Sequence, residues 1–95
     1  MKHLFTVDKR KVLKTLARSG MSMKEAMEQC GQHRTWLNAY VLINDTLGAQ
    51  AIVTLATGFG VKGSSLLAPG QRQRWRNWVI QNQRESDALF DLEFR

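Results

Sequence analysis

The stretch that decides the fold is residues 21–41, MSMKEAMEQCGQHRTWLNAYV, which predicts two short helices on either side of a glycine. Ser22 and Glu25 have the spacing of a capping box, in which each side chain accepts a hydrogen bond from the other residue's backbone N–H. The first helix therefore begins at Ser22 and ends at Gly31, because glycine readily takes the positive φ needed after a helix. Its apolar side consists of Met23, Ala26, Met27 and Cys30.

The second helix of this stretch is expected over residues 33–43, with its apolar side chains directed toward the core. These are Trp36, Leu37, Tyr40 and Val41, with Ile43 at the end.

A further helix is expected just before this stretch. Asp8 caps it and Gly20 ends it. Its apolar side consists of Val12, Leu13, Leu16 and Ala17, and its other side of Lys9, Arg10, Lys11, Lys14 and Arg18. Residues 8–43 are thus expected to form a core of three helices.

The segment after the core, residues 45–57, fits two structures. Leu47, Ala51, Ile52, Leu55 and Ala56 match a helix, whereas the run 52–55 would also suit a strand. A helix is favoured, with its cap at Asn44 or Asp45, because every earlier segment is helical and a lone strand has nothing to pair with.

Two further segments complete a single all-α domain over residues 1–95. Residues 58–70 predict a glycine-rich connector, in which Gly58 stops the preceding helix. Residues 69–94 predict a C-terminal helical segment, with Pro69 in the first turn and Trp75, Trp78 and Val79 on one side. A last short helix is expected to begin at Ser86 or Asp87 and to carry Leu89, Phe90, Leu92 and Phe94.

Residues 21–41 resemble the helix-turn-helix motif of small bacterial and phage transcriptional regulators. Ser22, Glu25-Ala26, Gly31, Leu37 and Tyr40 carry the resemblance, and the helix over 8–19 suits the usual three-helix arrangement. Met27 and Gln32 differ from the family pattern, which favours alanine and a buried aliphatic residue at those places.

The resemblance implies that the second motif helix enters the major groove of duplex DNA. His33, Arg34, Thr35 and Asn38 would then face outward. Arg34 suits guanine and Asn38 suits adenine, because each can form a bidentate pair with that base. Contacts to bases or phosphates would add Gln32, Ser22 and Lys24, with Lys11 and Lys14 on the phosphate backbone. Operators of such proteins are usually palindromic and bound by symmetric dimers.

Charge supports a polyanionic partner. The chain has a formal net charge of +6, but its residues 1–84 carry 13 basic and 4 acidic residues, a net charge of +9. Residues 85–95 carry Glu85, Asp87, Asp91 and Glu93 against Arg95 alone, a net charge of −3. A basic body of this kind attracts nucleic acid, although a solvated surface that maintains solubility would have the same composition.

The basic segment QRQRWRNWVIQNQR, residues 71–84, has three interpretations. It is a closing helix whose tryptophans pack on the core, a phosphate-binding or dimer-forming helix, or an arginine-rich RNA-binding helix. Secondary nucleic-acid contacts are expected from Lys62, Arg72, Arg74 and Arg76. The acidic tail could fold back on this helix or pack on a partner subunit, so residues 46–57 and 86–94 are candidate dimer surfaces.

Catalytic, cofactor and metal chemistry have little support in the sequence. The spacing Gly58-x-Gly60-x-x-Gly63 matches a dinucleotide-binding fingerprint, but a helix is expected before it and no sheet accompanies it. Cys30-x-x-His33 is half a zinc site at most, and Cys30 falls on the apolar side of its helix. We therefore expect no enzyme activity, no cofactor and no metal.

The sequence as a whole predicts a homodimeric, sequence-specific DNA-binding regulator that represses transcription by occluding a promoter. The alternatives are an RNA-binding regulator that uses residues 71–84, or a helical protein-interaction inhibitor or adaptor. A single cysteine and no visible secretory signal favour the cytoplasm, with association to the nucleoid. No membrane span and no small-molecule effector are evident.

Overall fold

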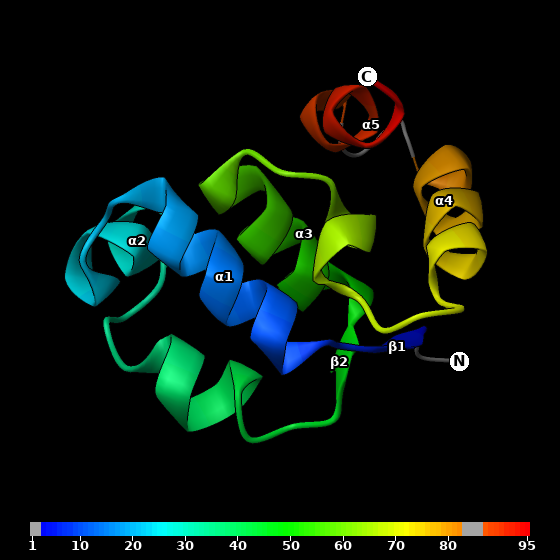
Figure 1. Ribbon diagram of the computed structural model, residues 1–95. Helices are drawn as coiled ribbons and strands as arrows, with labels where there is room; N and C mark the ends of the chain where they lie inside the picture. The colour runs from blue at the N-terminus through cyan, green and yellow to red at the C-terminus, as the bar shows by residue number, and fades with distance from the viewer. Residues whose placement is uncertain (1–2, 83–86) are drawn as a thin grey trace.

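The computed structural model describes residues 3–82 and 87–95 (Figure 1). Its elements, in chain order, are β1 (Leu4–Thr6), α1 (Lys9–Ser19), α2 (Met23–Gln29), the π-helical turn η1 (Leu37–Val41), β2 (Thr46–Gly48), α3 (Ala49–Phe59), the 3₁₀ turn η2 (Gly63–Leu66), α4 (Arg72–Gln81) and α5 (Asp87–Phe94). Figure 1 shows α4 and α5 on one side of the molecule and α2 on the other, with α1 and α3 between them. The described chain is mostly helical, as predicted.

The helix boundaries around α1 and α2 follow the predicted capping. The Asp8 carboxylate accepts hydrogen bonds from the backbone N–H groups of Arg10 and Lys11, at 3.0 and 3.3 Å. Ser22 and Glu25 form the complete capping box. Gly20 and Gly31 follow the two helices with φ of 70° and 68°, values that glycine adopts without a steric penalty.

A small antiparallel sheet corrects the all-α prediction. β1 pairs with β2 in the register Leu4 to Gly48, Phe5 to Leu47 and Thr6 to Thr46. Each strand turns its middle residue, Phe5 or Leu47, into the core. Residues 52–55, the run that would also suit a strand, are helical as favoured, and the strand lies at 46–48, where the N-terminal residues pair with it.

The helix predicted over 45–57 therefore begins later than expected. α3 starts at Ala49 with Gly48 as its N-cap, and residues 46–48 belong to the strand. Asp45 serves other contacts instead of capping a helix. Its backbone oxygen accepts a hydrogen bond from Val7 N–H at 3.1 Å, and its exposed carboxylate lies 3.5 Å from Lys9 Nζ.

The glycine-rich stretch 58–70 is more ordered than a connector. α3 continues through Gly58 and ends at Phe59, with Gly60 in the left-handed conformation. Gly63 opens η2 and is buried against Trp75, so a Cβ atom there would lie 2.5 Å from Trp75 Cε2. α4 begins only at Arg72, which leaves Pro69 in the preceding turn rather than in the helix.

Trp75 lies at the centre of the C-terminal half of the core. Its ring meets Phe5 edge to face at 5.2 Å and stacks on Trp78 at 5.2 Å. Trp75 and Val79 are fully buried and Trp78 is half-buried, which confirms the interpretation of α4 as a closing helix. In the N-terminal half, Leu13 was predicted to face inward but is 47% exposed, whereas Val12 is buried.

α5 folds back on the chain through one buried carboxylate. Glu93 has no solvent exposure and accepts hydrogen bonds from Trp75 Nε1 at 2.9 Å, Arg76 Nε at 3.3 Å and the backbone N–H of Ser64 at 3.1 Å. The Ser64 hydroxyl donates to it as well. The acidic tail therefore packs on the basic helix, one of the two expected arrangements.

The two predicted dimer surfaces are largely used inside the chain. In the segment 46–57, the buried side chains are Leu47, Ala49, Ile52, Leu55 and Ala56. Among the large apolar side chains of residues 87–94, Leu89 is buried, Phe90 and Leu92 are half-buried and Phe94 is 39% exposed. Ser86, one of the two expected helix starts, lies outside the described residues.

Replacing Glu93 with glutamine should destabilise the protein by about 1–3 kcal/mol. An amide keeps the size of the side chain, but its NH₂ group would face either the Arg76 guanidinium or the Trp75 indole N–H, leaving two donors opposed. Urea unfolding followed by tryptophan fluorescence measures the change. The control is Glu28→Gln at an exposed position, which should change stability by no more than about 0.5 kcal/mol. Equal effects of the two substitutions would contradict this role for Glu93.

Candidate nucleic-acid interface

Five of the predicted DNA-contacting residues lie around one hollow. Ser22, Lys24, Arg34, Thr35 and Asn38 line it together with Met23 and Ala39, and its volume is about 540 Å³. We call it the α2–η1 hollow, because its walls come from the start of α2 and from the segment that leads into η1. The sequence separates these residues into two groups, 22–24 and 34–39, so the turn through Gly31 is what joins them.

The second motif helix is irregular, which corrects the prediction of a regular helix over 33–43. Along this segment, the backbone N–H donors bond to carbonyl oxygens that lie progressively further back in the sequence. Trp36 N–H donates to His33 O, Ala39 N–H to Thr35 O and Leu42 N–H to Leu37 O, all at 2.8–2.9 Å. The spacing changes from three residues to four and then five, so the segment widens into the π-helical turn η1. Such turns are rare and often occur at functional sites.

Widening changes which side chains the segment buries. Leu37 and Val41 are fully buried, as predicted. Tyr40 is 41% exposed and Ile43 is 68% exposed, so their inward placement was wrong. Trp36 is half-buried and stacks on Tyr40 at a ring distance of 5.8 Å. The inward face is therefore narrow, and Arg34 and Asn38 remain on the exposed face.

His33 and Gln32 lie outside the lining of the α2–η1 hollow. His33 Nδ1 lies 3.2 Å from the backbone N–H of Thr35 and 2.9 Å from its hydroxyl, so the imidazole closes the first turn of the segment. Gln32 is half-buried, and its backbone N–H donates to Met27 O at 2.9 Å. Met27 is itself fully buried, so the larger residue fits where the family favours alanine.

The remaining predicted contacts divide into two groups. Lys11, Lys14, Lys62 and Arg72 line two adjoining hollows between α1 and the segment from Phe59 to Arg72, which we call the α1 groove. The larger hollow measures about 650 Å³ and the smaller about 390 Å³. Arg18 also lines the groove, although the sequence analysis did not select it. Its spacing from Lys11 and Lys14, at i, i+3 and i+7, would have shown that they share a helical face.

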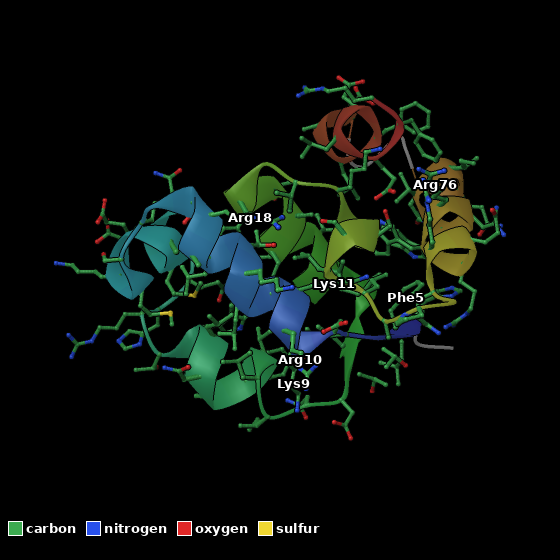
Figure 2. The ribbon with its side chains drawn as sticks, in the orientation of Figure 1. Phe5, Lys9, Arg10, Lys11, Arg18 and Arg76 are labelled. Carbon is green, nitrogen blue, oxygen red and sulfur yellow. The ribbon has the colours of Figure 1, made fainter. Side chains whose placement is uncertain are left out.

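Arg74 and Arg76 belong to the C-terminal half of the core instead. Arg74 donates to Gln71 Oε1 at 2.8 Å and to the backbone oxygen of Leu4 at 3.2 Å, and lies over the Phe5 ring. Arg76 pairs with Glu93 and lies over Phe94 (Figure 2). Two of the three arginines expected to bind RNA, and the buried Trp75 between them, are thus committed to intramolecular contacts.

Candidate metal and nucleophilic groups are sparse in residues 3–82 and 87–95. This part of the chain holds no cluster of three His, Cys, Asp or Glu side chains that could bind a metal ion. Cys30 is a free, half-buried thiol that lies against Gly58, and burial raises its pKa above the ordinary value. A raised pKa means less thiolate at neutral pH and a poorer nucleophile. None of the described helices is long and apolar enough to cross a bilayer.

Comparison with known proteins found no matching family model, no matching curated protein and no matching solved structure.

Alkylation should report the environment of Cys30. The pH at which its reaction with iodoacetamide reaches half its maximal rate should be higher in the folded protein than in the urea-unfolded chain, because burial disfavours the thiolate. Mass spectrometry of samples quenched between pH 7 and 10 measures both profiles. A folded-state profile at or below the unfolded one would contradict the raised pKa.

Proposed function

We propose that the protein is a sequence-specific DNA-binding regulator that reads duplex DNA with the exposed face of residues 33–42. The observation that supports this most strongly is the α2–η1 hollow. It brings Arg34, Thr35 and Asn38 next to Ser22 and Lys24, as base-reading and phosphate-holding groups need to be. These residues are the ones that the helix-turn-helix resemblance and their side-chain chemistry had indicated from the sequence.

The residues around the hollow fall into two chemical groups, one suited to base edges and the other to phosphates. Arg34 carries five N–H donors in a planar fork that suits the O6 and N7 atoms of guanine. The Asn38 amide carries an NH₂ donor group beside a carbonyl acceptor, the pattern that adenine N7 and N6 require. The two residues are four positions apart on one face of the segment, and both are exposed. Lys24 and Ser22, also exposed, would hold the neighbouring phosphates.

The charge of the body supports the same function. Residues 1–84 are strongly basic, which favours association with DNA of any sequence and lets a protein search along it. Within this proposal the protein acts in the cytoplasm, bound at the nucleoid. It represses by occluding a promoter, the simplest mechanism available because it requires no separate effector domain. Two copies would bind the two halves of a palindromic operator.

Selection of bound sequences from a random duplex pool tests the proposal directly. We expect an enriched palindromic consensus that contains a G and an A at positions matching Arg34 and Asn38. Arg34→Ala and Asn38→Ala should each cost about 1–3 kcal/mol on the selected duplex and relax the preference at one base. Gel-shift titration at fixed salt measures both effects.

The matched control is Arg95→Ala, which removes one exposed arginine at the far end of α5. It should weaken binding slightly and equally for selected and unselected duplexes, since only net charge changes. If no sequence is enriched, or if Arg34→Ala and Arg95→Ala behave alike, the protein does not read bases through this segment.

A further inference from the structure

The α1 groove has a composition that the proposed DNA reading leaves unexplained. Lys11 and Ser65 line both of its hollows, so the two hollows adjoin. α1 forms one wall, and the end of α3 with the following segment forms the other. Figure 2 shows Lys11 and Arg18 extending from α1 toward that segment, with Lys9 and Arg10 nearer the opposite edge of the helix. The groove and the α2–η1 hollow have no lining residue in common.

Positive charge is concentrated in this groove. Lys11, Lys14, Arg18, Lys62 and Arg72 line it, and none of the described residues that line it is acidic. Within the described part of the chain these five cations form no ion pair, since the two ion pairs found there involve Lys9 and Arg76. Lys11 Nζ donates one hydrogen bond, to Leu67 O at 3.0 Å, and retains two further protons. Five unpaired cations around one depression repel one another, and an anion would relieve that repulsion.

The hydroxyl groups of the groove offer acceptors rather than donors. Thr15 donates its proton to Lys11 O at 2.8 Å, and Ser65 donates its proton to Lys62 O at 2.6 Å. Ser19 likewise donates to Leu16 O. A hydroxyl has a single proton, so what these groups can present to a ligand is lone pairs. They suit a ligand that carries N–H or O–H groups in addition to its negative charge.

The larger hollow also has an apolar wall. Phe59 and Val61 are both half-buried and both line it. An aromatic ring beside cations is suited to stacking on a flat ring whose substituents are charged. A simple inorganic anion would leave this wall without a partner.

We propose that the α1 groove binds a nucleotide that carries two or more phosphates. The base lies against Phe59, its amino group or the sugar hydroxyls donate to Thr15 and Ser65, and the phosphates contact the five cations. The larger hollow, at about 650 Å³, falls within the range of about 300–1,000 Å³ that small-ligand sites occupy. The smaller hollow adds Lys62 and Arg72 for the distal phosphates. A duplex backbone would present sugars and phosphates but no base ring to Phe59, so it suits the groove less well.

The site does not depend on the reading of bases, because it shares no residue with the α2–η1 hollow, although Lys11 and Lys14 were expected to contact the DNA backbone. Calorimetric titration of the full chain with ATP and with GTP tests it, at low ionic strength and without metal ions. Lys14→Glu and Arg18→Glu should each weaken binding about tenfold or more, because each replaces an attractive charge with a repulsive one. Arg10→Glu makes the same charge change on α1 at an exposed residue that lines neither hollow, and should weaken binding by less than about threefold.

Phe59→Leu separates the nucleotide from a bare polyphosphate. This variant keeps an apolar side chain but removes the ring, so it should weaken ATP binding and leave the binding of inorganic triphosphate unchanged. Circular dichroism checks that each variant is folded. Where a charge reversal unfolds the chain, Lys14→Gln and Arg18→Gln replace it, with Arg10→Gln as their control.

Four results would overturn the proposal. The first is no saturable binding of ATP or GTP, and the second is equal weakening by Arg18→Glu and Arg10→Glu. The third is that inorganic triphosphate binds the wild-type protein as tightly as ATP does and that Phe59→Leu changes neither affinity. That result would indicate an anion site that makes no contact with a base. The fourth result would come from a titration with a thymidine oligonucleotide. If the single strand binds through the groove and free nucleotides do not, the groove tracks a nucleic-acid backbone instead.

Discussion

The Glu93 carboxylate is the interaction on which the C-terminal half of the molecule depends. It is fully buried and accepts hydrogen bonds from α4, through Trp75 and Arg76, and from η2, through Ser64. A carboxylate removed from water is costly unless donors surround it, and here every described donor comes from another element. Neither α4 nor η2 can move away without leaving this charge unsatisfied. One side chain therefore fixes the positions of α4, α5 and η2 relative to one another.

This constraint reaches the α1 groove through η2. Ser64 is bound to Glu93, and its neighbour Ser65 lines both hollows of the groove. Gly63, on the other side of Ser64, packs so closely on Trp75 that no larger residue fits without displacement. The wall of the groove that faces α1 is therefore attached to the core rather than being a free loop. A wall whose backbone is already held in place binds a ligand at a smaller entropic cost than a loop that must first be ordered.

Sequence reasoning succeeded where one residue decides a local structure. Asp8, Ser22 with Glu25, Gly20 and Gly31 each act within a few positions of themselves, so their roles follow from spacing and stereochemistry. It failed for the strands, because the paired residues Phe5 and Leu47 are 42 positions apart in the sequence. Each strand also has only three residues, too few to show an alternating pattern of apolar and polar side chains. It failed for Tyr40, because the segment widens into a π-helical turn that buries Leu37 and Val41 and leaves Tyr40 exposed.

The two candidate interfaces also differ in how far the sequence predicts them. Arg34 and Asn38 could be chosen together because a spacing of four positions along a helix predicts a shared face. The turn at Gly31 then brings Ser22 and Lys24 to them. The α1 groove could not be seen in the sequence, since Phe59 and Ser65 approach Lys14 and Arg18 only through the packing of η2 on the core. The contact of Arg74 with the Leu4 carbonyl could not be predicted either, because it depends on where β1 lies, whereas the pairing of Arg76 with Glu93 is one form of the expected contact between the acidic tail and the basic helix.

The shortness of the reading segment limits how much one chain could distinguish. The polar side chains that precede or enter the π-helical turn on the exposed face and also line the hollow are Arg34, Thr35 and Asn38. A good bidentate contact distinguishes bases by about 1–3 kcal/mol, so one copy would discriminate two or three positions. That is too little to locate a site among the unspecific sequence of a genome, which is why the proposed regulator needs two half-sites. The apolar side chains of residues 46–57 and 86–94 are mostly buried in the chain, so a pair of copies would have to meet through exposed groups such as Leu13, Tyr40 and Ile43.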